Sequence, residues 1–118
     1  MAFDRDLADR IHAVLSDVPD LTGKPLFGGY GVFRRGVMFA GVFRAQLMVK
    51  LREGAADAML EPHTSGFDPM GKGTPMTGWV MVDAVATGTD EELRDWLDRA
   101  LAAIPPGATK SKPKKRKK

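Results

Sequence analysis

The chain has 118 residues, of which 43% are hydrophobic and 28% charged, as expected for a single globular domain. It contains no cysteine, which excludes disulfides, thiolate metal sites and a cysteine nucleophile. The formal net charge of +3 is unevenly distributed, because residues 110–118 hold seven Lys or Arg and no acid, whereas residues 1–109 hold 11 basic and 15 acidic residues. We therefore expect a mildly acidic domain over residues 1–107 and a disordered basic tail over residues 108–118.

Residues 4–18 are predicted to form an amphipathic helix. Their apolar residues recur at a spacing that places them on one stripe: Leu7, Ile11, Val14, Leu15 and Val18. Pro19 ends the helix because it has no amide hydrogen to donate. His12 falls at the edge of the polar arc, where we expect an exposed side chain.

The central part of the chain is predicted to form an antiparallel meander of three strands over residues 32–33, 37–43 and 47–51, which are rich in β-branched and aromatic residues. Arg34, Arg35 and Gly36 fit a three-residue hairpin loop, in which Gly36 takes a positive φ. Apolar residues occupy both alternating sets of positions in 37–43, so this strand is expected to be central and covered on both faces.

A dense glycine cluster, Gly28-Gly29-Tyr30-Gly31, precedes this meander. Backbone amides in such a cluster can cradle a phosphate, but a dinucleotide fingerprint beginning at Gly29 would need its third glycine where Arg34 stands, and it would lead into a helix. A tight backbone packing role is therefore the favoured interpretation.

Residues 54–61 are predicted to form a short helix ended by Pro62, and residues 63–78 a long loop. Residues 66–72 match the spacing of a phosphate-binding P-loop, but Gly73 stands where Ser or Thr must hold magnesium, and a strand follows instead of a helix. The sequence therefore argues against nucleotide hydrolysis.

Two other readings of this loop concern its polar residues. His63, Ser65 and Asp68 are residue types found in hydrolases, yet their closeness in one loop is more typical of turn formers. His63 and Asp68 also lack a third metal ligand at a familiar spacing. A remaining alternative is a small-molecule-binding or enzymatic domain, in which residues 66–78 form a lid and Lys72 or His63 points into a pocket.

The last part of the domain is predicted to contain a fourth strand over residues 79–82, with Trp79 in the core or at an edge. Thr89 and Glu92 have the spacing of a capping box, which begins a helix that Pro105 ends. One apolar stripe runs along that helix: Leu93, Trp96, Leu97, Ala100, Leu101 and Ile104. The predicted fold class is α+β, with a small antiparallel sheet (a three-strand meander plus a fourth strand) flanked by N- and C-terminal helices.

The basic tail is the one segment whose composition points directly to a ligand. Its cations are Lys110, Lys112, Lys114, Lys115, Arg116, Lys117 and Lys118. Such a run binds nucleic acid weakly and without sequence preference, because it releases condensed counterions and places no side chain in a groove. The alternative is a tail that only increases solubility.

Several of these segments together resemble a known family. The similarity rests on the order of residues 26–33, 36–39 and 47–50, and its signature positions are Phe27, Gly28, Gly29, Tyr30, Gly31, Met38, Phe39 and Lys50. In these residues the chain resembles the N-terminal domain of the TfoX/Sxy competence regulators. The resemblance implies an α+β fold, no catalytic residues, no cofactor, and a role in DNA uptake or transcription regulation beside a DNA-bound transcription factor.

The sequence thus leads to a small regulatory or adaptor protein that acts through a transcription factor-like protein partner and is not an enzyme. The acidic N-terminus offers no export signal and no charge-free run is long enough to span a bilayer, so we expect a cytoplasmic protein without membrane contact. A homodimer through an exposed sheet edge is a further expectation.

Overall fold

The computed structural model describes residues 3–26, 28–68, 73 and 76–105. In chain order the described elements are α1 (Arg5–Val14), β1 (Leu21–Leu26), β2 (Gly29–Arg34), β3 (Val37–Phe43), β4 (Gln46–Lys50), a 3₁₀ turn (Arg52–Gly54), α2 (Ala55–Ala58), β5 (Thr64–Gly66), β6 (Trp79–Val82), a second 3₁₀ turn (Ala84–Thr87) and α3 (Asp90–Ala103).

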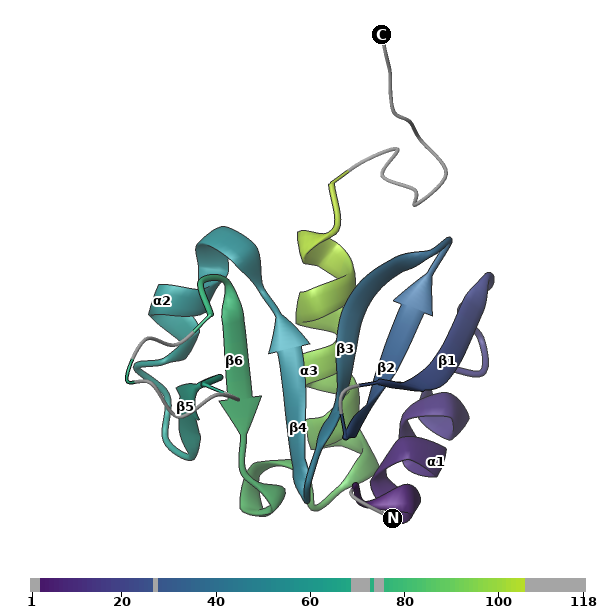
Figure 1. The fold of residues 1–118 in the computed structure, drawn as a ribbon, viewed down its shortest axis with the longest axis horizontal. Coiled ribbons are helices and arrows are strands. Elements are labelled where there is room, and N and C mark those ends of the chain that lie inside the picture. The colour runs from purple at the N-terminus through teal and green to yellow at the C-terminus, as the bar shows by residue number, and fades with distance from the viewer. Residues whose placement is uncertain (1–2, 27, 69–72, 74–75, 106–118) are drawn as a thin grey trace, which may run out of the picture.

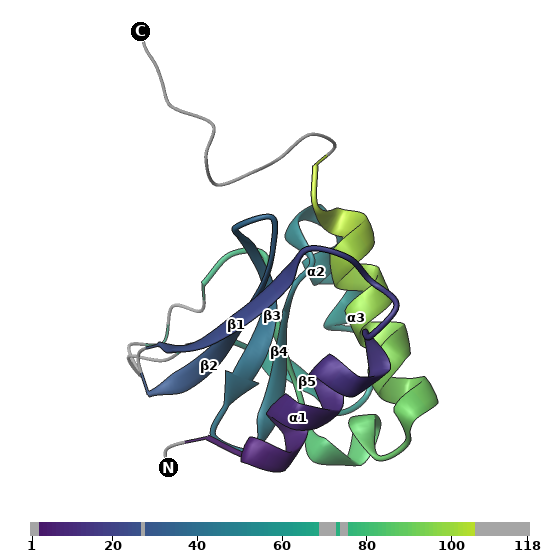
Figure 2. The same cartoon turned by 90° about the vertical axis from the view of Figure 1, so that its right-hand side faces the viewer.

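The strands form one antiparallel sheet in the order β1-β2-β3-β4-β6-β5, and the three helices lie on the same side of it (Figures 1 and 2). This arrangement confirms the predicted α+β class. Within the described ranges, no helix is long and apolar enough to cross a membrane.

The strand count in the prediction was wrong, since the described sheet has six strands and not four. The missed strands are the two edges. β1 contains Gly23 and Pro25 and is exposed over residues 22–25, so it has neither the alternation nor the composition of a strand, and it exists because it pairs along its whole length with β2. β5 has only three residues within the predicted loop, and its pairing with β6 defines it.

The hairpin loops are shorter than predicted. Arg34 pairs with Val37, so the β2–β3 connection is the two-residue turn Arg35-Gly36, with φ values of 53° and 82°. Positive φ at both positions is the geometry that suits the twist of a two-residue hairpin. The positive φ expected at Gly36 is therefore confirmed, whereas the three-residue loop was wrong.

The predicted helices are present but two of them are shorter. α1 ends at Val14, and Val18 then closes a further turn by donating its amide to the Leu15 carbonyl at 2.9 Å. The helix expected over residues 54–61 is a 3₁₀ turn followed by the four-residue α2. In α3 both bonds of the Thr89–Glu92 capping box are formed, which confirms the predicted start of that helix.

The main core lies between the helices and the sheet. α1 contributes Leu7 and Ile11, and α3 contributes Leu93, Trp96, Leu97 and Ala100, packed against the helix-facing side chains of the sheet: Val32, Phe39, Val42, Leu47, Val49, Val80 and Val82. A second, smaller cluster lies on the opposite face, where Met48, Phe67, Trp79 and Met81 pack together. The middle of β3 is consequently buried, as predicted for a central strand, while its two ends are half-buried.

Candidate functional site

The glycine signature is a strip of close backbone packing between β2 and β3. A Cβ atom at Gly29 would lie 2.6 Å from the Val42 carbonyl oxygen, and one at Gly31 would lie 3.0 to 3.1 Å from three side chains: Leu26, Phe33 and Met38. Gly41 of β3 pairs with Gly31, and a Cβ there would overlap the Tyr30 carbonyl oxygen. Gly29 and Gly41 need glycine because a Cβ there would meet backbone, and a Cβ at Gly31 would require the ends of neighbouring side chains to shift, which supports the packing interpretation over a phosphate cradle.

Tyr30 of this signature joins the sheet to α1. Its hydroxyl lies 2.8 Å from Nε2 of His12, and its ring packs 5.4 Å from the ring of Phe3. A Cβ at Gly23 on β1 would lie 2.7 Å from the same His12 nitrogen, so glycine there leaves room for the hydrogen bond. Burial raises the pKa of Tyr30, which keeps the phenol protonated.

The expectation that His12 is exposed was wrong, because its side chain is half-buried against Tyr30. The helical stripe alone did not reveal this contact, since the partner is a residue 18 positions further along the chain. The sequence did offer one signal. Tyr30 is the chain's single tyrosine, and the glycines beside it leave room for its long polar side chain.

The remaining signature residues point to different parts of the molecule. Phe39 is fully buried in the main core, whereas Met38 packs against the second cluster on the opposite face. Lys50 places its ammonium 5.8 Å from the ring centroid of Trp79. Gly28 has a φ of 79° in the β1–β2 turn, and Phe27 is outside the described residues. The signature therefore specifies a fold and does not converge on one pocket.

The polar residues of the 63–78 segment do not form one site, because each has a different position or contact. Ser65 is exposed on β5, where it pairs with Met81, and Asp68 accepts a hydrogen bond at 2.8 Å from the Gly73 amide. The Asp68 contact is that of a turn former, as the sequence suggested. Within the part of the chain that the structure describes, no group of three or more His, Cys, Asp or Glu side chains could hold a metal ion.

The hypothesis that residues 66–78 form a lid requires a pocket beneath them. Phe67 instead packs directly on the sheet, with its ring centroid 5.3 Å from that of Phe43 in an edge contact and 6.1 Å from that of Trp79. Met76 donates its amide to the Phe67 carbonyl at 2.8 Å, while its side chain is 47% exposed, and Lys72 lies outside the described residues. His63 lines a surface beside α3. The described contacts therefore favour a segment that packs directly on the sheet over a lid that closes a pocket.

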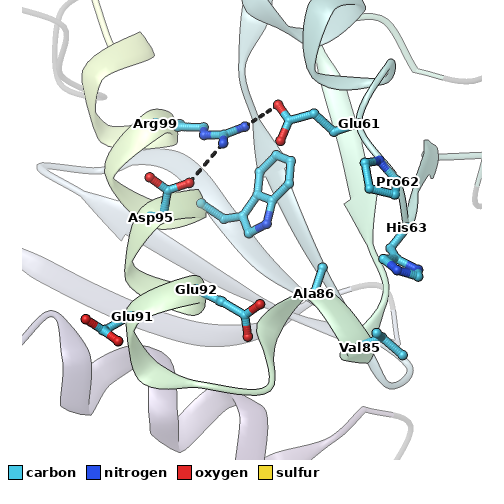
Figure 3. A pocket seen from close by; sticks show the side chains of 10 residues that line it. Glu61, Pro62, His63, Val85, Ala86, Glu91, Glu92, Asp95 and Arg99 are labelled. Carbon is cyan, nitrogen blue, oxygen red and sulfur yellow. Dashed lines mark hydrogen bonds and ion pairs between the residues drawn. The ribbon is translucent and has the colours of Figure 1, made fainter.

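That surface beside α3 is a shallow concavity of about 630 Å³ between α3, the segment after α2 and the second 3₁₀ turn (Figure 3). Arg99 donates to Glu61 at 2.6 Å and to Asp95 at 2.9 Å, and its guanidinium lies 4.2 Å from the ring centroid of Trp96. The hydrogen bond to Glu61 raises the pKa of Arg99 further above its already high usual value. Its charge is thus fixed at every physiological pH.

The rim of the concavity is acidic. It is lined by Glu61, Glu91, Glu92 and Asp95, with the exposed side chain of Val85 beside them. Glu92 is engaged in the helix cap and Glu61 and Asp95 hold Arg99, so these three carboxylates have structural partners. An open, paired and partly apolar surface of this kind suits protein docking better than acid–base chemistry.

The seven cations of the tail, Lys110 to Lys118, lie outside the described residues, as does the boundary drawn at residue 107. The tail therefore stays a prediction from composition.

Comparison with known proteins agrees with the fold and with the signature. The family described as the TfoX N-terminal domain matches residues 13–104, which include all six strands, the end of α1 and the whole of α3. A search of curated proteins found no match. Since the family match covers most of the chain and its signature residues form the β2–β3 strip, the chain belongs to the TfoX N-terminal domain family.

Proposed function

We propose that this protein is a cytoplasmic regulatory or adaptor protein that acts through a protein partner, in transcription regulation or DNA uptake, and not as an enzyme. The observation that carries the proposal is the family match over residues 13–104. Its signature residues are used to build the fold, so the family likeness extends to the shape of the whole domain and not to a catalytic constellation.

The concavity beside α3 is the surface we assign to the protein partner. Its carboxylate rim, together with the 70% exposed Val85, would complement a basic segment with an apolar anchor. The basic tail then has a separate task, which is to hold the protein near nucleic acid without reading its sequence.

The tether is tested by measuring binding to a DNA duplex across a salt series. With about six phosphates neutralised, log K should fall against log salt concentration with a slope near −5 for the full chain. A chain ending at residue 107 should lose most of this affinity and slope. A matched control keeps the length and replaces the seven tail cations by Gln, and it should behave like the truncated chain.

If truncation leaves both the affinity and the salt slope unchanged, the tail is not the tether. If neither chain binds at low salt, the tail does not bind DNA and the tether proposal is wrong.

A further inference from the structure

Charge in the folded domain is segregated by layer. Residues 21–52, which form β1 to β4 and their turns, contain six Lys or Arg and no Asp or Glu. All 15 acidic residues therefore lie outside that segment, and α1 and α3 alone hold seven of them. The domain is acidic as a whole, yet its first four strands carry only positive charge.

Three of these cations lie over aromatic rings of the sheet. Lys24 places its ammonium 5.4 Å from the ring centroid of Phe33, and Lys50 lies 5.8 Å from that of Trp79. Arg44, in the β3–β4 turn, lies 5.3 Å from the ring of Phe43. All three distances lie within the range of about 6 Å at which a cation is attracted to the face of an aromatic ring.

These rings belong to the face of the sheet opposite the helices, because Trp79 and Phe43 lie in or against the second cluster and Phe33 pairs with Met38, which packs against the same cluster. Phe33 and Met38 contact the position where a Cβ of Gly31 would stand, and Phe43 packs with the second cluster on the same face. Gly31 and Gly41, paired at the middle of this face, are buried beneath neighbouring side chains, among them Phe33, Met38 and Met48, so the face there is made of apolar side chains. Phe33, Met38 and Phe43 are each only half-buried among the described residues.

The spacing of the two phenylalanines suits an extended strand. Phe33 pairs with Met38, five residues before Phe43 on β3, which corresponds to about 16 Å along the strand direction. A stacked nucleic-acid strand rises about 3.4 Å per nucleotide, so the two rings span about five nucleotides.

We propose that this open face, formed by Lys24, Phe33, Phe43, Arg44 and Lys50, binds single-stranded nucleic acid. Bases would stack on Phe33 and Phe43, while the three cations would leave the rings to pair with phosphates, as in other aromatic and basic platforms for single strands. The major groove of a duplex admits a helix or a two-stranded ribbon, and this sheet is wider than that, so duplex DNA should bind it more weakly. The site is independent of the basic tail and of the protein partner proposed above.

The cationic half of the proposal is tested with two charge-matched double variants of the full chain. One carries Lys24→Gln and Lys50→Gln on the open face, and the control carries Arg5→Gln and Arg10→Gln on α1. Binding of fluorescent ten-nucleotide oligothymidine and oligouridine is titrated at several salt concentrations. The face variant should lose about fivefold to tenfold in affinity and about 1.4 in salt slope, while the control should lose less than twofold.

Equal losses in the two variants would overturn the proposal, since net charge alone would then explain them. Binding of either strand supports it, and their ratio says whether DNA or RNA is preferred. In the full-length variant whose seven tail cations are replaced by Gln, tighter binding of a duplex of the same length than of the single strand would also overturn it.

The stacking half is tested with Phe33→Leu, which keeps an apolar side chain of similar size. It should weaken oligonucleotide binding about fivefold or more, with unchanged circular dichroism and an unchanged salt slope. An acidic polypeptide, polyglutamate, is the competing probe. If polyglutamate binds as tightly as the oligonucleotide and depends on Lys24 and Lys50, while Phe33→Leu changes neither ligand's binding, the face docks an acidic protein and the proposal is wrong.

Discussion

At the scale of single residues, Gly29 and Gly31 of the family signature, and Gly41 beside them, are explained by what surrounds them. Gly31 and Gly41 face each other across β2 and β3, and side chains from neighbouring strands, among them Met48, lie over the pair. Glycine weakens a strand because it is conformationally free, so its presence here must be offset by close packing that no side chain would permit. The signature is therefore a steric requirement of the sheet.

Gly41→Ala tests this requirement against Gly54→Ala. A Cβ at Gly41 would lie 2.7 Å from the Met48 methyl and overlap the Tyr30 carbonyl oxygen, so we expect a loss of about 1–3 kcal/mol in the free energy of unfolding. Gly54 has nothing within 4 Å and a φ of −78°, so alanine there should be neutral or should stabilise by up to about 1 kcal/mol.

Urea unfolding of both variants measures these values. A Gly41→Ala protein within about 0.5 kcal/mol of the wild type would show that the strip is not tightly packed.

At the scale of the elements, α1 and α3 are joined by two arginines, and Arg94 makes more of these contacts than Arg10, which pairs with Asp90 at 3.3 Å. Arg94 of α3 donates to the Val14 carbonyl at 2.7 Å, to Asp17 at 2.9 Å and to Asp98 at 2.8 Å. It thereby satisfies a carbonyl at the end of α1 and holds the chain that leaves it. The hydrogen bond from Arg94 lowers the pKa of Asp17 below its ordinary value, and the bonds from Asp17 and Asp98 raise the pKa of Arg94.

This contact predicts a pH-dependent effect of Asp17→Asn. Because the folded pKa of Asp17 is depressed, its contribution to stability is present above the unfolded pKa of about 3.9 and is lost as the pH falls through the folded value. The variant should therefore be less stable than the wild type at pH 7 and equal to it at the acid end of the transition.

Unfolding free energies from pH 2 to pH 7 measure this difference, with an Arg94→Gln, Asp17→Asn double variant as the control. A gap between Asp17→Asn and the wild type that stays constant with pH would mean that the ion pair is not its cause.

Some of these elements could be predicted from the sequence and others could not. α3 was predictable because its capping box and its apolar stripe are both local, and the same holds for the buried β6. β1 was not, since it is an exposed edge whose Gly23 and Pro25 carry no strand signal and whose order comes from pairing with β2. The His12–Tyr30 contact was missed for the same reason, because it joins two distant segments.

At the scale of the whole molecule, the protein has two chemically different sides. One is a helical layer that carries most of the carboxylates, and the other is a sheet face with aromatic rings and cations. The net charge of residues 1–109 does not show this division, because it adds the charges of both sides. The run from 21 to 52 without Asp or Glu is nevertheless visible in the sequence. If both proposals hold, a protein partner and a nucleic acid would be held on opposite sides without competing.

The most direct test is amide NMR of the isotope-labelled full chain during titration with ten-nucleotide oligothymidine. We predict chemical-shift changes in residues 22–26, 31–34, 42–44 and 48–50, together with changes in the tail, while the amides of α3 remain unaffected. Changes confined to residues 108–118, or changes centred on α3, would contradict the two-sided account.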